Sequence, residues 1–245
     1  MSHDVIEQTI LVVNGDLTFS GGKSQFAVAQ KFLNELSDAF HSVTDKQLRI
    51  ICTPGNHDCD FSNDQSARNQ LLTKLKPTLP AKSIEAVVLE PLANYMEFVK
   101  ACDFDGSINS SNPYKTEIRI EAVSGTIDIA LLNSSWMSSR QESPGSILFP
   151  KECFTRHTEG VTRIVALHHP PNWFKQPETM RDLIRWVTEN ADICMSGHEH
   201  SVDSQLKLNE RFRGVMYYEG GVFQEHSEDS SGQFQVLDIC TESGE

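Results

Sequence analysis

Hydrophobic residues in this chain fall into short blocks that polar turns separate. An apolar block bounded by turn residues predicts a strand that is buried on both faces. Buried strands are expected in this way at Thr9–Val13, Leu48–Cys52, 161–167 and Ile193–Ser196. Between the first two blocks, apolar residues recur every three or four positions over 24–40, which predicts a helix with one apolar stripe.

The rest of the chain predicts further elements on the same grounds. Residues 59–83 are polar and contain prolines, so the segment 59–112 is interpreted as an insertion or cap, with a helix starting after Pro91. Further strands are expected at Lys115–Ala122, 126–132, 202–208, 213–218 and 233–239, and a further helix over 180–187. Helices and strands alternate early and strands dominate late, so residues 1–245 are predicted to form one α/β domain with layered sheets.

Charge and cysteine usage narrow the function classes. The 245 residues contain 21 basic and 34 acidic side chains, a net charge of −13, which disfavours general binding to nucleic acids or anionic membranes. No apolar run approaches the ~20 residues of a membrane span, and no signal peptide is visible. The six cysteines form no Cys-x-x-Cys pair, so we expect reduced thiols and a cytoplasmic location.

Polar clusters follow four of the predicted strands directly. Ligands of α/β proteins bind beyond the carboxyl ends of the strands, so these clusters can meet at one point. The candidate ligands are Asp16, Asn56, His168, His198 and His200. Carboxylate, amide and imidazole donors without thiolates suit Mn²⁺, Fe²⁺ or Zn²⁺.

Each cluster also has a simpler interpretation. Gly15-Asp16 is a common turn, Asn56 suits an Asx turn, and histidines at strand ends are often only exposed or capped side chains. However, five of the nine histidines fall in these clusters (57, 168, 169, 198 and 200), and a coincidence at four strand ends favours a shared metal site.

Together the clusters resemble the motifs of the calcineurin-like metallophosphoesterases, in particular the branch similar to bacterial cyclic-AMP phosphodiesterases. The motifs are Gly-Asp at 15–16, Gly-Asn-His-Asp at 55–58, His-His-Pro-Pro at 168–171 and Gly-His-Glu-His at 197–200. The resemblance implies a four-layer α/β/β/α sandwich and two divalent metal ions. It also implies hydrolysis of a small phosphoric ester, a phosphodiester or phosphomonoester such as a cyclic nucleotide, by a metal-activated hydroxide.

The resemblance also implies roles for individual residues. Asp16 would bridge both ions, Asn56, His168 and His198 would complete one site, and His200 would ligate the other ion.

The catalytic roles that the resemblance implies fall on the Gly-Asn-His-Asp motif. His57 would face the phosphate and protonate the leaving oxygen, and Asp58 would orient His57. His169 would lie behind the metal ligands.

One departure from the family pattern concerns the start of the chain. The family places an Asp-x-His motif on a strand well before the Gly-Asp, whereas only 15 residues precede Asp16 here. We therefore expect the first core strand to be missing and the second metal site to be incomplete. A truncated start is one explanation, which would leave further domains of a longer chain outside this sequence. A degenerate, non-catalytic sensor or interaction module is the other.

Overall fold

The computed structural model describes residues 6–102, 112–123, 125–156, 158, 160–199, 203–208, 214–221 and 234–239, with the backbone alone described for 203–208. The strands are β1 Thr9–Val13, β2 Leu48–Cys52, β3 Lys115–Ala122, β4 Gly125–Leu132, β5 Thr162–Leu167, β6 Ile193–Ser196, β7 Asp203–Leu208 and β8 Gly214–Glu219. The α-helices are α1 Lys23–Thr44, α2 Ser66–Leu72, α3 Lys82–Val88, α4 Ala93–Cys102 and α5 Met180–Asn190.

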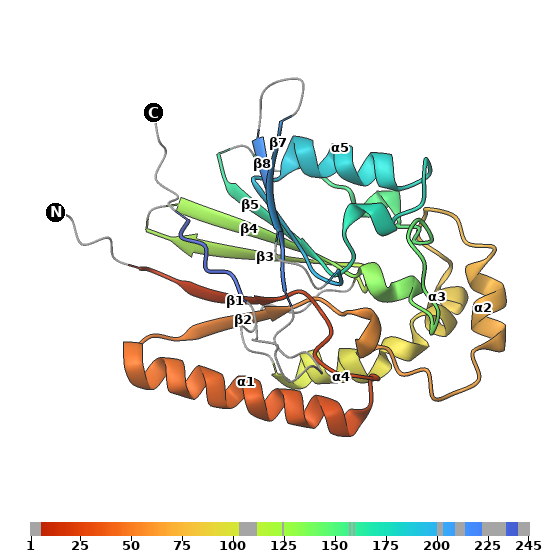
Figure 1. The fold of residues 1–245 in the computed structure, drawn as a ribbon, viewed down its shortest axis with the longest axis horizontal. Coiled ribbons are helices and arrows are strands. Elements are labelled where there is room, and N and C mark those ends of the chain that lie inside the picture. The colour runs from red at the N-terminus through yellow and green to blue at the C-terminus, as the bar shows by residue number, and fades with distance from the viewer. Residues whose placement is uncertain are drawn as a thin grey trace.

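These elements form four layers, as the resemblance implied. Helices α1 and α4 cover one face of the β1–β2 sheet, the larger sheet lies on the other face, and α5 covers the larger sheet from outside (Figure 1). Parallel β1 and β2 pair from Thr9↔Leu48 to Val13↔Cys52. The larger sheet has the order β3-β4-β5-β6-β8-β7, in which β4, β5, β6 and β8 are parallel neighbours.

Three apolar clusters fill the spaces between the layers. The first joins the larger sheet to α5 and the loops around it, with Trp136 and Phe149 fully buried. The second lies between the β1–β2 sheet and helices α1 and α4, around Leu33 and Ile50. The third lies between the two sheets, around Ile51 and Ile129. The central strands β4 and β5 are therefore largely buried on both faces, which explains their continuous apolar runs.

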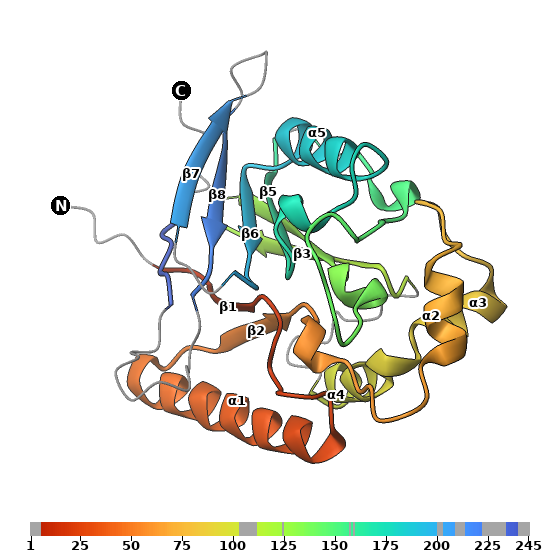
Figure 2. The same cartoon turned by 45° about the vertical axis from the view of Figure 1, so that its right-hand side comes forward.

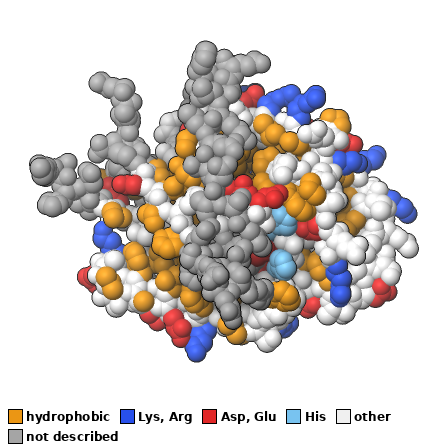
Figure 3. All heavy atoms as spheres, in the orientation of Figure 1, with side chains coloured by type: hydrophobic (Ala, Val, Ile, Leu, Met, Phe, Trp, Pro, Cys, Tyr) orange, Lys and Arg blue, Asp and Glu red, His pale blue; other side chains and the backbone are white. Residues whose placement is uncertain are grey.

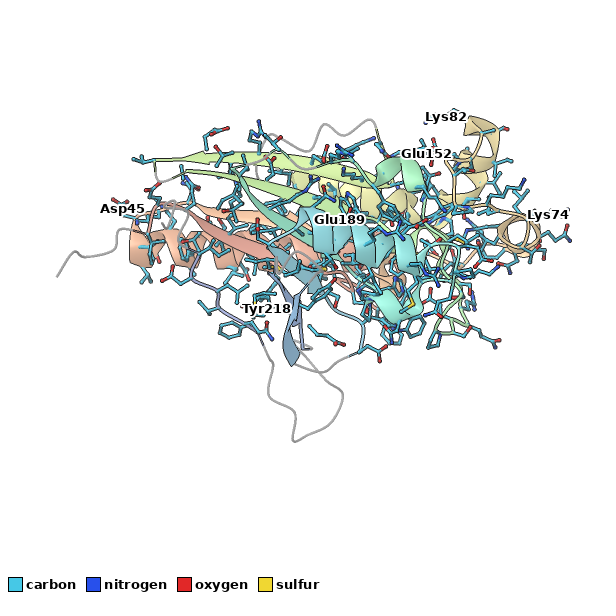
Figure 4. All side chains as sticks on the ribbon, turned by 90° about the horizontal axis from the view of Figure 1, so that it is seen from above. Asp45, Lys74, Lys82, Glu152, Glu189 and Tyr218 are labelled. Carbon is cyan, nitrogen blue, oxygen red and sulfur yellow. The ribbon has the colours of Figure 1, made fainter. Side chains whose placement is uncertain are left out.

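The segment after β2 has two structural parts. Helices α2 and α3 lie together at one end of the molecule (Figure 2), and in the view from above Lys74 and Lys82 mark that end while Asp45 marks the other (Figure 4). Helix α4 instead packs on α1 through Phe98 and Phe26, whose ring centroids are 5.1 Å apart. The interpretation of 59–112 as an insertion stays a prediction.

A buried arginine connects α2 to the main body. The Arg68 guanidinium is 3% exposed and donates hydrogen bonds to the carbonyl oxygens of Val88, Trp136 and Ser138 at 2.8, 3.0 and 2.7 Å. Burial is the main cause that lowers the pKa of Arg68. The three bonds join the α2–α3 segment to the loop after β4, because two of the carbonyls belong to that loop.

The expected strand at 233–239 is wrong for its described part, because residues 234–239 lie outside any strand. Phe234 and Val236 are 74% and 82% exposed, whereas Leu237 and Ile239 are half-buried. Exposed and half-buried residues alternate along this segment because one of its sides lies against the protein. A strand also needs a neighbouring strand as hydrogen-bond partner, which an alternating pattern does not supply. Among the described helices, none has both the length and the apolar character needed to cross a membrane.

Candidate metal centre

The carboxyl ends of strands from both sheets meet at one place. The Asn14 side chain, which follows β1, donates to the carbonyl oxygen of Ser196 at the end of β6 at 3.3 Å. The carbonyl oxygen of Asn14 in turn lies 2.6 Å from Nδ1 of His168, directly after β5. These contacts bring loops that are far apart in the sequence to a common site. On the face shown in Figure 3, histidine side chains reach the surface beside acidic ones.

Two glycines allow these loops to approach one another. Gly15 has φ +94°, and a Cβ there would lie 2.5 Å from His168 Nδ1. A Cβ on Gly55 would lie 2.0 Å from Asp16 Oδ1. Any side chain at either position would displace a candidate ligand, so the glycines of both motifs are required by close contact.

Four of the five predicted ligands place a donor atom at one point. From Nε2 of His168, Oδ1 of Asn56 and Nδ1 of His198 both lie at 3.0 Å, and Oδ2 of Asp16 lies at 3.4 Å. Asn56 Oδ1 and His198 Nδ1 are 3.2 Å apart. Ligands of one ion with bonds of ~2.1 Å are separated by about 3.0 Å in an octahedron and about 3.4 Å in a tetrahedron. The four atoms are therefore spaced as neighbouring ligands of a single ion.

The protonation of His168 supports this arrangement. Its Nδ1 donates to the Asn14 carbonyl, which leaves a lone pair on Nε2. The ring is 1% exposed, and burial is the main cause that lowers its pKa well below the usual range, so the imidazole is neutral. Its lone pair then faces the amide oxygen of Asn56 and the carboxylate of Asp16. Acceptors that face one another in a buried site fit a cation between them.

His198 reaches the site from a strained backbone. Its φ is +74°, a conformation that residues other than glycine rarely adopt. Its ring lies edge-on to Trp173 with centroids 4.2 Å apart, and 4.6 Å from the ring of His169. The surrounding rings thus hold the side chain in a conformation that costs energy, as is common at functional sites.

His169 lies behind the ligands, and both of its ring nitrogens are engaged. Nδ1 is 2.9 Å from Ser134 Oγ, and Nε2 is 3.2 Å from Oε2 of Glu142. The nitrogens of His168, His169 and His198 lie within 4.8 Å of one another, which by distance alone would make His169 a ligand. We assign it a supporting position instead, because neither nitrogen has a lone pair left for an ion.

Glu142 is an acid beside His169, and its side chain is largely buried. Burial raises its pKa, but the hydrogen bonds of His169 and Ser138 and the charges of His169 and His198 together lower it more. The net pKa is therefore below the usual value, and the side chain is ionised. Sequence reasoning missed Glu142, because it lies in a polar loop with no motif around it. The nearest signal in the sequence was the strand predicted at 126–132, after which this loop begins.

The two predicted catalytic residues differ in their surroundings. The exposed His57 donates its backbone N–H to Asp16 Oδ1 at 3.0 Å, and its Nδ1 lies 2.9 Å from the carbonyl oxygen of Phe19. Asp58 is fully buried and accepts hydrogen bonds from the backbone N–H groups of Gly55 and Thr18, both at 2.9 Å.

The expected orienting role of Asp58 toward His57 is therefore not a direct hydrogen bond between the two side chains. The Phe19 carbonyl holds the His57 ring, and the Asp58 carboxylate holds the loop that contains both residues. Burial is the main cause that raises the pKa of Asp58 to about 7, although hydrogen bonds from the backbone of Gly55, Thr18 and Leu17 act in the opposite direction. The remaining predicted ligand, His200, lies outside the described residues.

Comparison with known proteins identifies the family of this chain. The family model described as calcineurin-like phosphoesterase matches residues 3–202, and the chain belongs to this family. The family consists in general of hydrolases that use divalent metal ions to cleave phosphoric esters.

Individual relatives add little beyond the family. A crystal structure of a dimetal phosphatase from Danio rerio matches with a TM-score of 0.37 and 9% identity, over 87% of this chain and 72% of that chain. A likeness at that level carries no argument about this protein. The comparison with curated proteins gave no match.

Proposed function

We propose that this chain hydrolyses a small phosphoric ester with a divalent ion held by Asp16, Asn56, His168 and His198. The convergence of three further donor atoms at 3.0–3.4 Å from His168 Nε2 carries the proposal. The donor set of two imidazoles, a carboxylate and an amide fits Mn²⁺, Fe²⁺ or Zn²⁺. A bound cation also offsets the net charge of −13, which would otherwise repel an anionic substrate.

The ion would supply a water of lowered pKa as the nucleophile and would neutralise charge on the phosphoryl oxygens. The side chains of the protein prepare that chemistry. Asn56 is uncharged, so the site keeps more of the positive charge of the ion than a second carboxylate would allow. The bond from His168 to Asn14 fixes the ring so that Nε2 faces inward.

His57 is proposed to protonate the leaving oxygen. Its ring is held through Nδ1 by the Phe19 carbonyl, which leaves Nε2 for the substrate. Its backbone N–H is bonded to Asp16, so the ring lies beside the ligands without being one of them. A positioned general acid contributes about 10²- to 10⁴-fold to the rate.

A second ion, shared through Asp16 and held by His200, remains part of the proposal, with the first site filling before it. The substrate is proposed to be a phosphodiester or phosphomonoester, with cyclic nucleotides among the candidates, and the cellular location to be the cytoplasm. A metal-binding module without catalytic activity is the rival outcome of the following experiment.

The experiment measures metal content and hydrolysis together. The chelator-treated chain is loaded with Mn²⁺, the bound ions are counted by mass spectrometry, and hydrolysis of bis(p-nitrophenyl) phosphate is followed. We expect at least one ion per chain and metal-dependent turnover. Asn56→Ala removes one donor, so it should lower both metal affinity and turnover by more than about 100-fold.

Asn69→Ala is the matched control, because Asn69 is exposed on α2 and lies outside the site. It should keep full metal content and turnover. Metal binding without turnover on mono- and diester probes would favour the non-catalytic module. No loss of metal affinity in Asn56→Ala would overturn the assigned site.

A further inference from the structure

We propose that Phe19 determines specificity by contacting an aromatic ring in the alcohol part of the substrate. The inference rests on the proposed function and names a substrate class for it, namely phosphoric esters whose leaving group carries an aryl or heteroaryl ring.

Phe19 is a large apolar side chain in an exposed position beside the site. It is 69% exposed, and it follows Asp16 by three residues on the loop after β1. Its ring centroid lies 5.7 Å from that of His57, at an interplanar angle of 34°. Single exposed apolar side chains are common, so exposure alone assigns no role. The position of the Phe19 ring next to the proposed general acid is what suggests a role in binding.

The loop presents this ring from a fixed backbone. Oε1 of Gln25, in the first turn of α1, accepts hydrogen bonds from the backbone N–H groups of Phe19 and Ser20 at 3.1 and 2.9 Å. The hydroxyl of Thr18 donates to the carbonyl oxygen of His57 at 2.9 Å. A preorganised aromatic surface loses little conformational entropy when a ligand binds.

The position relative to His57 decides which part of the substrate meets the ring. His57 Nε2 is proposed to face the leaving oxygen, so the group attached to that oxygen is the one nearest to Phe19. Aromatic pairs favour offset or tilted contacts with centroids 4.5–7 Å apart, and they gain more than their buried area supplies. A saturated group of equal size would gain only the free energy of burying its apolar surface. The difference in affinity between the two groups makes the inference testable.

The test compares two phosphonates that the enzyme cannot hydrolyse at their carbon–phosphorus bonds. Calorimetry measures the dissociation constants of benzylphosphonate and cyclohexylmethylphosphonate for the full Mn²⁺-loaded chain, with methylphosphonate as the anchor without a ring. We expect benzylphosphonate to bind roughly three- to tenfold more tightly than its saturated analogue.

Variants connect this preference to one side chain. Phe19→Leu should bring the ratio of the two dissociation constants close to one, and Phe19→Trp, with its larger π face, should raise it above that of the wild type. Phe32→Leu makes the same change at a half-exposed phenylalanine on α1 and should keep the wild-type ratio. AMP and phenyl phosphate, assayed as competitors, distinguish a nucleobase from a simple aryl group.

The outcomes separate this inference from the proposed function. If methylphosphonate binds but the wild type shows no benzyl preference, or if the preference persists in Phe19→Leu, the role of Phe19 is wrong and the proposed function stands. If no phosphonate binds to the metal-loaded chain, the proposed function fails, and the inference fails with it.

Discussion

Two regions of this protein bury polar side chains, and they satisfy them in opposite ways. On the larger sheet, the buried Lys115 and Arg163 both contact Oε1 of Glu117, at 2.7 and 2.8 Å, so opposite charges meet. The Trp186 ring lies 5.6 and 5.4 Å from the two cations. At the strand ends, by contrast, His168 Nε2 and Asn56 Oδ1 present lone pairs to each other at 3.0 Å.

The difference separates a structural cluster from the proposed metal site. A buried polar group costs free energy unless it finds a partner. In the Lys115 cluster, Glu117 supplies a carboxylate to both cations, although Nε of Arg163 has no hydrogen-bond partner. For the strand-end cluster, the proposed partner is a metal ion. Acceptor atoms that face one another are therefore a stronger indicator of a candidate site than burial or charge alone.

The largest expected effect tests the proposed acid beside the strand-end cluster. His57→Ala should lower turnover by about 10²- to 10⁴-fold, because a general acid is lost, and should leave metal content unchanged, because His57 supplies no donor atom to the site. Steady-state kinetics and metal analysis measure the two effects separately. The control His41→Ala changes an exposed histidine of α1 and should alter neither. Loss of metal from His57→Ala would show that His57 is a ligand.

A second prediction concerns the charged residue behind the ligands. Glu142→Leu removes the acceptor for His169 Nε2–H and should lower Mn²⁺ affinity by about 10- to 100-fold, measured by competition with a chelator. Glu142→Gln keeps an acceptor oxygen and should lose less.

The control for this prediction is Glu35→Leu, on an exposed position of α1. Equal affinity in Glu142→Leu and the wild type would mean that Glu142 does not support the metal site.

The smallest effect is expected in the structural cluster. Glu117→Gln leaves Lys115 and Arg163 buried without their carboxylate, so the free energy of unfolding at pH 7 should fall by about 1–2 kcal/mol. Burial raises the pKa of Glu117, but the hydrogen bonds and charges of Lys115 and Arg163 together have the larger effect. The net pKa is therefore below the usual value. A carboxyl with a lowered folded pKa stabilises the fold above its unfolded pKa and loses that contribution as pH falls through the folded pKa.

Urea unfolding at several pH values checks this sign. The difference between Glu117→Gln and the wild type should be full above about pH 5 and should shrink as the pH falls below it. Glu121→Gln, on an exposed position of β3, is the control and should change little. A difference that stays constant down to low pH would exclude the charge as its cause.

Much of the fold was predictable because its signals are local. The apolar blocks at Thr9–Val13 and Leu48–Cys52 became β1 and β2 with the expected bounds, and the ligands follow such blocks directly. Helix α1 ends later than the expected 24–40, at Thr44, because its last turn has few apolar residues and a left-handed Asp45 ends it.

The rest depends on contacts that no local pattern encodes. Glu142 and Arg68 act through partners 27 and 70 residues away, respectively His169 and Ser138. The resemblance implied that Asp58 orients His57, whereas the Asp58 carboxylate accepts hydrogen bonds from the backbone N–H groups of Gly55 and Thr18. These partners of Asp58 depend on how the loops after β1 and β2 pack together, which no local pattern in the sequence encodes.

The hydrogen bonds of Arg68 have a consequence for recombining this domain with its relatives. A chimaera that replaces α2 and α3 would remove the donor to the carbonyl oxygens of Trp136 and Ser138. Those two residues belong to the loop that continues to Glu142. The exchange would therefore also affect the contact between Glu142 and His169. A replacement segment must therefore carry a cation at the position of Arg68. Helix α2 and the loop after β4 have to be exchanged together, although 60 residues separate them along the chain.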